Sequence, residues 1–281
     1  TYSSAEQTFT VERFLLDWTL IGGVIATPGE FDASPWTGNC TAAVVGERVL
    51  FTAAHCVSNG GAKNFTIKGV SYTSKCARHP EYRGNSTADF AVCLVNKKVE
   101  GISYEVVATT IKYSVGLQLL LSGYGCQKWG GGLDGKYRIG KARITKIPSG
   151  SNYDTVTVGD VALCSGDSGG PAWQVFEDGT RELIGVNSRS NTTTTSYLSS
   201  HATVTAQNFY KSWAQANSVK ICGIHSDAQG CRSGSKPQDP VTFVVKKGDT
   251  TFEITWEPDA TFTVEEAKLA FEDAADYLEE K

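Results

Sequence analysis

One serine of this chain lies in a run dense with glycine, Cys164-Ser165-Gly166-Asp167-Ser168-Gly169-Gly170-Pro171. An earlier run, Thr52-Ala53-Ala54-His55-Cys56, places a histidine beside a cysteine. A serine hydroxyl is a poor nucleophile until a nearby base takes its proton. A nucleophile and a base in such distinctive settings therefore indicate covalent acyl-transfer chemistry.

Serine catalysis needs a nucleophile, a base, a carboxylate that orients the base, and hydrogen-bond donors for the oxyanion. Ser168 is the candidate nucleophile. The flanking glycines let the backbone approach closely, so the N–H groups of Gly166 and Ser168 are the candidate oxyanion-hole donors. His55 is the candidate base. The other histidines lack an equally characteristic setting: His79, His201 and His225.

The orienting carboxylate is harder to choose from the residues alone. Asp89 lies ahead of the apolar run Ala91 to Val95, and a carboxylate at the edge of a strand can be buried and held in place. The alternative interpretation of Asp89 is an aspartate that belongs to a turn or a cap.

The composition bounds the size and the partners of the protein. A chain of 281 residues is long enough for one large domain or two smaller ones with buried cores. The net charge of -4 gives no reason to expect nucleic acid as a partner. No apolar run approaches the ~18 residues that would span a bilayer, so no membrane is expected. No signal peptide is visible, which indicates a processed chain.

Eight cysteines form an even, dispersed set, and none lies in a CxxC pair. Zinc is therefore not expected, and no metal or other cofactor is predicted. The set indicates four disulfides in an oxidising compartment, so we expect a secreted or otherwise extracytoplasmic protein. The alternative is a cytosolic protein with free core thiols. Four N-x-[ST] sequons begin at Asn39, Asn64, Asn85 and Asn191. They would carry glycans only if the source organism glycosylates its proteins.

Most of the chain has the pattern of short β-strands separated by clusters of Gly, Asn, Asp and Ser. The β-rich runs are Arg48 to Phe51, Ile102 to Val107, Leu117 to Leu121, Tyr137 to Ile147 and Leu183 to Val186. Many short strands of this kind predict a β-barrel or a sandwich. A helix is expected from Thr205 to Asn217, before a loop that Cys222 and Cys231 would clip.

The character of the chain changes near its C-terminus. Val241 to Val245 and Thr251 to Trp256 predict a hairpin. Thr263 and Glu266 form a capping-box pattern that opens a final helix. From Asp239 onward, twelve acidic residues against four lysines give a charge of -8, which leaves about +4 on the rest. This ββα extension is either a solvated acidic surface or a docking or inhibitory module attracted to the more basic body.

Three runs in order, TAAHC at 52–56, DFAV at 89–92 and GDSGGP at 166–171, resemble the trypsin/chymotrypsin family of serine endopeptidases. The resemblance covers roughly Leu20 to Ser218. It implies an all-β fold of two antiparallel six-stranded β-barrels with the active site in the cleft between them. It assigns His55 as general base and acid, Asp89 as orienting carboxylate and Ser168 as nucleophile. Gly166 and Ser168 would donate the oxyanion-hole hydrogen bonds.

The expected organisation follows from this resemblance. Residues 1–19 form an N-terminal extension, and residues 20–219 form the protease domain, with barrels at about 20–105 and 115–204. Residues 220–281 form a disulfide-clipped linker and the acidic extension with its C-terminal helix. The partners implied are protein or peptide substrates, and we expect a monomer.

The family pattern also implies how the cysteines pair. Cys164 lacks its usual downstream partner, because no cysteine occurs before Cys222. We therefore pair Cys164 with Cys126, which follows a Gly-Tyr-Gly segment similar to the family's GWG. The expected disulfides are Cys40–Cys56, Cys76–Cys93, Cys126–Cys164 and Cys222–Cys231.

The run that begins at Leu20, LIGG, resembles the mature N-terminus of the family. In that family, cleavage frees an amine that pairs with the aspartate before the nucleophile, here Asp167. Residues 1–19 precede Leu20, so we expect a propeptide and a zymogen whose site is poorly formed while they stay attached. Thr19, the residue before the bond to Leu20, is not basic, which argues against a trypsin-like activating protease. Arg13 is the nearest upstream alternative. The competing interpretation makes Thr1 the mature N-terminus.

The chain departs from the trypsin pattern where specificity is set. Ala162, followed by Leu163, stands six residues before the nucleophile, where trypsin-like enzymes carry an aspartate. A buried cation would have no counter-charge there, so a preference for Arg or Lys is not expected. The family's S-W-G segment appears here as Ser188-Arg189-Ser190, which would narrow or block the pocket.

With Ala202 at the pocket wall, small or medium apolar residues are the first expectation for the substrate. An acidic residue is the second, and four side chains could recognise it: Arg189, Ser190, Asn187 or His201. Arg189 could equally be an exposed side chain without a role in selectivity.

The sequence therefore predicts a secreted serine endopeptidase, present as a zymogen, that cleaves peptide bonds through an acyl-enzyme on Ser168. The alternative is a protease-like binding or decoy protein whose cleft is kept closed by Arg189 and a retained N-terminus. The intact set of His55, Asp89 and Ser168 argues against this alternative.

Overall fold

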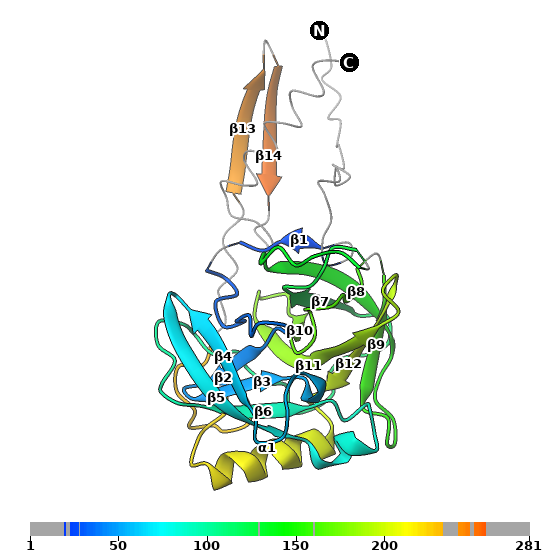
Figure 1. Ribbon diagram of the computed structural model, residues 1–281. Coiled ribbons are helices and arrows are strands. Elements are labelled where there is room, and N and C mark those ends of the chain that lie inside the picture. Colours follow the sequence, from blue (N-terminus) through cyan, green and yellow to red (C-terminus); the bar gives the residue numbers. More distant parts are fainter. Residues whose placement is uncertain are drawn as a thin grey trace.

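The structure is a computed structural model of the chain. It describes residues 20, 23–27, 29–128, 130–159 and 161–232, together with the backbone of two strands at 241–247 and 250–256. The expected N-terminal extension and the expected final helix lie outside the described residues. Figure 1 shows two β-sheets side by side and one helix below them.

The C-terminal half of the body forms a closed barrel. Its sheet has the order β1-β8-β7-β10-β11-β12-β9, and a further pairing of β8 with β9 closes the last six strands into a ring. Every pairing in this sheet is antiparallel. The strands are β1 (Val24–Ile25), β7 (Gln118–Gly123), β8 (Arg138–Lys146), β9 (Asp154–Val158), β10 (Pro171–Val175), β11 (Arg181–Ser190) and β12 (Thr195–Ser200). The second of the two expected six-stranded barrels is therefore confirmed.

The N-terminal sheet is a half-barrel of five strands, in the order β2-β3-β6-β5-β4. Its strands are β2 (Ala43–Gly46), β3 (Val49–Thr52), β4 (Ala62–Ile67), β5 (Val70–Arg78) and β6 (Ala91–Val95). The expected sixth strand is missing among the described residues. The β-rich run from Ile102 to Val107 forms isolated bridges instead, from Tyr104 to Cys231 and from Val107 to Leu183.

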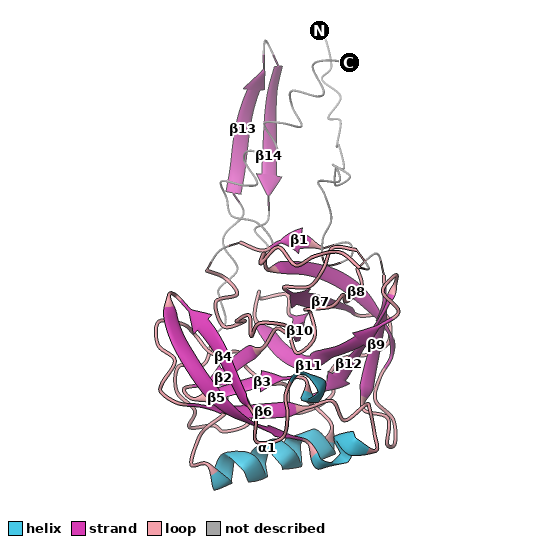
Figure 2. Ribbon diagram, in the orientation of Figure 1, coloured by secondary structure: helices cyan, strands magenta, loops and turns pink. Residues whose placement is uncertain are grey.

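One α-helix, α1 (Val204–Ala216), follows the closed barrel, as expected. Thr203 caps it by accepting a hydrogen bond from the Ala206 N–H at 3.4 Å. Tyr210 of α1 is buried and stacks on Phe51 of β3, with 4.2 Å between the ring centroids. The helix is therefore anchored to the N-terminal sheet, below which it lies in Figure 2. Two short 3₁₀ helices, η1 (Ala54–Cys56) and η2 (Pro80–Arg83), precede and follow the hairpin of β4 and β5 in the chain.

The expected C-terminal hairpin is also present. β13 (Val241–Lys247) pairs with β14 (Thr250–Trp256) in antiparallel register, from Val241 opposite Trp256 to Lys247 opposite Thr250.

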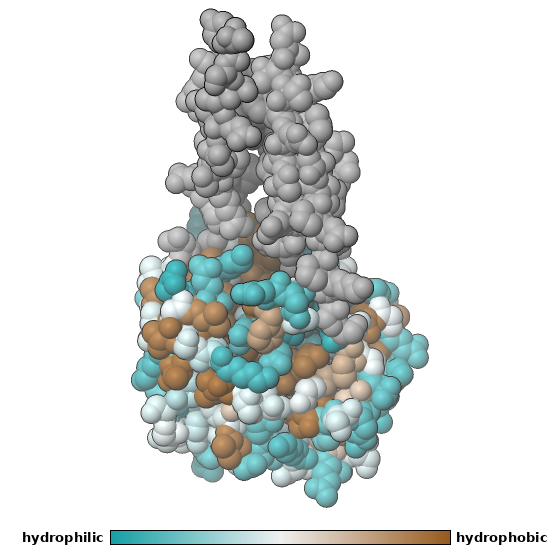
Figure 3. Space-filling model, turned by 180° about the vertical axis from the view of Figure 1, so that it is seen from behind, coloured by the Kyte–Doolittle hydropathy of each residue, from teal (hydrophilic) through white to brown (hydrophobic). Residues whose placement is uncertain are grey.

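The described surface mixes polar and apolar residues, and Figure 3 shows them interspersed over the face opposite to the view of Figure 1. Among the described helices, none is long and apolar enough to cross a bilayer.

Candidate active site

His55 and Asp89 meet where β3 ends and the neighbouring strand β6 begins. His55 lies in η1, directly after β3, and Asp89 lies just before β6. β3 and β6 pair antiparallel with Thr52 opposite Ala91, so these two ends are adjacent. The His55 N–H donates to Asp89 Oδ1 at 2.9 Å, and His55 Nδ1 lies 2.7 Å from Asp89 Oδ2. A carboxylate bonded to Nδ1 holds the imidazole in the tautomer that leaves Nε2 as a proton acceptor.

Ser188 completes the surroundings of this carboxylate. Its Oγ donates to Asp89 Oδ2 at 2.7 Å, and both side chains are almost fully buried. Ser188 is one of the residues expected to line the specificity pocket, and the structure shows its hydroxyl bonded to this carboxylate. Asp89 thus accepts three hydrogen bonds.

The turn of Ser168 is docked on the N-terminal sheet. Gly169 has a φ of +80°, and a Cβ at that position would lie 2.1 Å from Thr52 Oγ1. Only glycine therefore allows the turn to close against the end of β3. Ser168 itself is partly exposed, and its carbonyl accepts the Thr41 N–H at 2.8 Å. In the described part of the chain, no hydrogen bond joins Ser168 Oγ to His55. Such contacts often tighten only when substrate binds.

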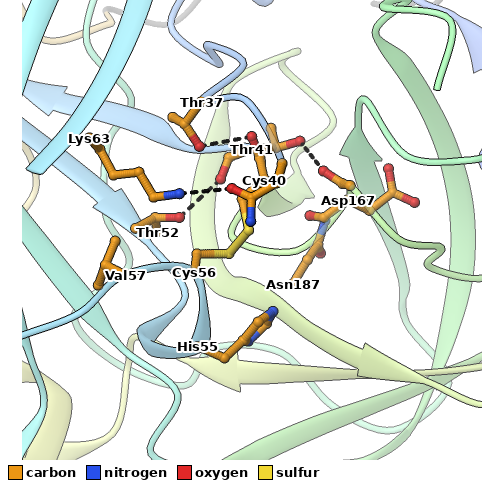
Figure 4. The surroundings of a disulfide bond; sticks show 12 residues. Thr37, Cys40, Thr41, Thr52, His55, Cys56, Val57, Lys63, Asp167 and Asn187 are labelled. Carbon is orange, nitrogen blue, oxygen red and sulfur yellow. Dashed lines mark hydrogen bonds between the residues drawn. A yellow bond between two sulfur atoms is a disulfide. The ribbon is translucent and has the colours of Figure 1, made fainter. Parts of the chain in front are cut away.

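Thr41 is a residue of this site that the sequence did not reveal. Its buried hydroxyl donates to the Gly166 carbonyl at 2.8 Å and accepts the Tyr124 N–H at 3.1 Å. It therefore joins three segments that lie far apart in the chain. Figure 4 shows it beside the Cys40–Cys56 disulfide, which runs next to His55.

The two expected oxyanion-hole donors are free within the described residues. The Ser165 carbonyl accepts the Cys126 N–H at 2.9 Å, and the Asp167 carbonyl accepts the Gly170 N–H at 2.9 Å. In a trans peptide the N–H points opposite to the carbonyl. The Ser165–Gly166 peptide therefore points its N–H away from Cys126, and the Asp167–Ser168 peptide points its N–H away from Gly170. Within the described residues, neither N–H group donates a hydrogen bond.

Asp167 lies behind this turn and is fully buried. Its Oδ1 accepts the Gly125 N–H and its Oδ2 accepts the Cys164 N–H, each at 2.8 Å. Burial raises the pKa of Asp167 to about 7, although these N–H groups and the charge of Arg138 lower it in part. No ion pair involves Asp167 among the described residues. Leu20 packs in the apolar core of the closed barrel.

Gly125 is required by the same arrangement. A Cβ on Gly125 would lie 2.4 Å from Asp167 Cγ. The Gly-Tyr-Gly segment can therefore approach the carboxyl only without a side chain at that position.

Three of the residues expected to line the pocket are buried in the structure. Ala162 is fully buried, Ala202 is nearly so, and Leu163 packs in the core of the closed barrel. Ser190 Oγ donates to the Leu163 carbonyl at 2.6 Å, which ties the two sides of the pocket region together. Leu163 therefore contributes to the core and also lies beside Ser190.

All four side chains suggested for acidic recognition are already engaged, Ser190 by its hydrogen bond to the Leu163 carbonyl. Asn187 Nδ2 donates to the Ser122 carbonyl at 2.7 Å. His201 is buried against Phe51, and burial lowers its pKa to about 3, so the ring is neutral. Arg189 forms an ion pair with Asp154 of β9. No unpaired cation among these residues is left for an acidic substrate.

Two loops meet beside this ion pair. The Asn85 Nδ2 donates to the Ser151 carbonyl at 2.8 Å, and Thr87 Oγ1 donates to the same carbonyl at 3.3 Å. Arg189 Nη1 reaches the Ser86 carbonyl at 3.4 Å. The loop before Asp89 is thereby fixed to the closed barrel.

The structure contains four disulfides, which join the cysteines paired in the sequence analysis: Cys40–Cys56, Cys76–Cys93, Cys126–Cys164 and Cys222–Cys231. One cluster of metal-ligand types occurs in the described part of the chain, Cys40, His55 and Cys56. Its two sulfurs are bonded to each other, so they cannot act as thiolate ligands. This cluster does not fit a metal ion.

Comparison with known proteins agrees with this geometry. The family model described as Trypsin matches residues 20–214, which is more than half of the chain, so the chain belongs to the trypsin family of serine proteases. It is similar to serine protease SP24D of Anopheles gambiae, with 27% identity over 182 residues. That match spans 54% of this chain and 66% of the relative, just under two thirds of its length. Four disulfides in a member of this family suggest an extracellular, oxidising location.

Proposed function

We propose that the protein is a secreted serine endopeptidase that hydrolyses peptide bonds through an acyl-enzyme on Ser168. The observation that carries the proposal is the bonding of His55 to the buried carboxylate of Asp89, next to the docked turn of Ser168. A base, an orienting carboxylate and a nucleophile are thereby supplied by three segments of the chain.

The chemistry follows from these positions. His55 Nε2 takes the proton of Ser168 Oγ, which attacks the carbonyl carbon of the scissile bond. The N–H groups of Gly166 and Ser168 stabilise the oxyanion. His55 then donates the proton to the leaving amine, and water attacks the acyl-enzyme by the same route. The Asp89 carboxylate stabilises the imidazolium, and no cofactor takes part.

The preferred substrate has a small or medium apolar side chain at the cleavage position. Ala162 offers no counter-charge for Arg or Lys. The ion pair between Arg189 and Asp154 and the neutral ring of His201 weaken the case for acidic residues.

A fluorophosphonate probe tests the catalytic assignment. It should label the wild-type protein, and Ser168→Ala should abolish labelling and lower peptidase activity by about 10,000-fold or more. Ser165→Ala is the matched control, because Ser165 is an exposed serine of the same turn and should retain labelling. Absence of labelling after every activating treatment would favour the protease-like binding protein instead.

The full chain is a zymogen in this proposal. Thr19 precedes Leu20, so Leu20 carries no free amine in this chain, and Asp167 has no ion-pair partner in the described residues. Release of an amine at Leu20 would supply a cation to the buried carboxyl.

N-terminal sequencing combined with active-site titration tests this point. The active species should begin at Leu20, and the intact chain should titrate to a much lower fraction of active sites. Full titration of a chain that still begins at Thr1 would contradict the zymogen proposal while leaving the endopeptidase proposal intact.

A further inference from the structure

Arg189 lies between two buried carboxylates. On one side its Nη2 pairs with Asp154, whose side chain is 3% exposed. On the other side its Nη1 lies 3.3 Å from Ser188 Oγ, which donates to Asp89 at 2.7 Å. A continuous chain of polar contacts therefore runs from Asp154 through Arg189 and Ser188 to the carboxylate that orients the candidate base.

The strand register places these groups. β11 and β9 both pair with β12, and Tyr197 of β12 stands opposite Arg189 on one side and Val156 on the other. The guanidinium lies over the Tyr197 ring, 4.8 Å from its centroid. Arg189 is therefore held by an ion pair and a cation–π contact, although 38% of its side chain stays exposed.

Asp154 depends on this cation. Its Oδ1 is buried and has no hydrogen-bond partner among the described residues. Burial raises the pKa of Asp154, the charge of Asp89 raises it further, and Arg189 with Lys146 of β8 opposes both. Tyr82 of η2 is the other titratable group that interacts with both Asp89 and Arg189, and Arg78 of β5 also acts on Tyr82.

We propose that Asp154 and Arg189 form a positioning pair for the catalytic carboxylate, and that Asp154 suppresses acidic selectivity by neutralising Arg189. Arg189 fixes the Ser188 hydroxyl toward Asp89. Asp154 removes the net positive charge that Arg189 would otherwise present beside the cleft. This inference rests on the proposed function, because it assigns a role in the reaction of Ser168.

The first test removes the charge of Asp154. In Asp154→Asn, the unpaired guanidinium disfavours the imidazolium of His55, so the midpoint of the acidic limb of kcat/KM should fall by roughly half a unit to one unit. Cleavage of peptides with Asp or Glu at positions before the scissile bond should rise by about tenfold relative to neutral peptides. The matched control is Glu182→Gln, which removes an acid of β11, the strand of Arg189, that pairs with Lys112 instead of with Arg189.

The second test removes the cation. Arg189→Gln should lower kcat/KM by about tenfold, because a hydrogen bond to the Ser188 hydroxyl is lost, and should not gain acidic selectivity. Compared with Arg189→Gln, Arg189→Lys should return the pH midpoint to the wild-type value but recover only part of kcat. An ammonium cannot bond both Ser188 and Asp154 as the planar guanidinium does. The double variant Asp154→Asn with Arg189→Gln restores the wild-type net charge and should restore its pH midpoint.

These outcomes separate the inference from the proposed function. If wild-type protein is not labelled by the fluorophosphonate, the proposed function fails. The His55 ring can still be titrated by NMR in the Ser168→Ala background of each variant, which reads the electrostatic link without catalysis. An unshifted His55 titration in Asp154→Asn, or unchanged selectivity in an active Asp154→Asn enzyme, overturns the inference. If Asp154→Asn does not fold, Arg189→Lys decides: a wild-type kcat would overturn the positioning role.

Discussion

Asp167 shows how a single buried group can link pH to stability. Its carboxyl is held by two backbone N–H groups, and burial raises its pKa to about 7 in the folded protein. The unfolded chain would release the same proton near the ordinary aspartate pKa of about 4. Between these values the native state binds a proton that the unfolded state has lost.

The expected result is a stability that falls as pH rises from about 4 to about 7. The raised pKa corresponds to a loss on the order of 4 kcal/mol in the free energy of unfolding at most. Asp167→Asn stays neutral at every pH, so its dependence over this window should be flatter than that of the wild type. Chemical denaturation across this pH range, carried out in the Ser168→Ala background to avoid autolysis, measures the free energy of unfolding with and without Asp167→Asn.

Asp178→Asn serves as the control, because Asp178 is an exposed loop aspartate. Parallel pH profiles for wild type and Asp167→Asn would show that Asp167 is already ionised in the folded chain.

At the same scale, sequence motifs mark some residues of the candidate site, and others carry no local signal. His55 and Asp89 lie where β3 and β6 meet, and short runs of sequence mark both. The pairing of Arg189 with Asp154 could not be predicted, because it depends on the register of two strands on either side of β12. Thr41 likewise carries no local signal, since its partners lie 125 residues away at Gly166 and 83 residues away at Tyr124.

Among the elements, the Cys126–Cys164 disulfide tethers the loop that carries the candidate oxyanion-hole donors, Gly166 and Ser168. It links segments 38 residues apart, and Cys126 also donates its N–H to the Ser165 carbonyl. Replacing both cysteines by alanine should lower the free energy of unfolding by about 4 kcal/mol, from the entropy of the opened loop. It should also lower kcat, because the peptide of Gly166 loses part of its support.

The Cys222–Cys231 bridge is the matched control. It closes a short loop with a sequence separation of 9, away from the candidate site. Its removal should cost about 2.6 kcal/mol by the same entropy argument and leave kcat unchanged. An equal loss of kcat in both variants would mean that the Cys126–Cys164 bridge acts on activity through stability alone.

One run of the chain shows that a β-forming sequence is not enough to make a strand. The run from Ile102 to Val107 has β-forming residues, but a ladder needs a free neighbouring edge along its length. The backbone of this run divides its hydrogen bonds among five partners: its N–H groups donate to Val44, Gly230 and Cys222, and its carbonyls accept from Leu183 and Arg232. The first barrel is therefore a half-barrel, and no property of the run itself predicts this.

For the whole molecule, a buried ionic cluster joins the segment between the sheets to the closed barrel. Arg181 of β11 donates to Glu105 at 2.6 Å and 3.0 Å, and Glu105 is fully buried. The guanidinium also lies 4.2 Å from the ring centroid of Phe31 and 4.7 Å from that of Trp173. The Glu105 N–H donates to the Val44 carbonyl of β2, so the cluster touches both sheets.

Removing one partner of this pair should be costly. Arg181→Met leaves Glu105 without its main counter-charge and should lower the free energy of unfolding by about 3–5 kcal/mol. The double variant Arg181→Met with Glu105→Leu should recover much of that loss, because neither charge remains buried. Denaturant titration of the three proteins measures these differences.

The exposed pair of Lys68 and Asp32 provides the comparison, since Lys68→Met removes a cation that solvent already screens. If the double variant were no more stable than Arg181→Met, the cost would come from lost ring and backbone contacts of Arg181, such as its bond to the Glu30 carbonyl.

The hydrogen bond from Asn85 to Ser151 has a practical consequence for whoever produces this protein. Its donor, Nδ2, is the atom to which an N-linked sugar would be attached, because Asn85 begins a sequon. A glycosylating host would place a bulky carbohydrate at the junction of the two loops beside Arg189, whereas a bacterial host would leave it bare. Preparations from the two hosts would present different entrances to long substrates. An Asn85→Gln protein made in both hosts is the reference against which their kinetics should be compared.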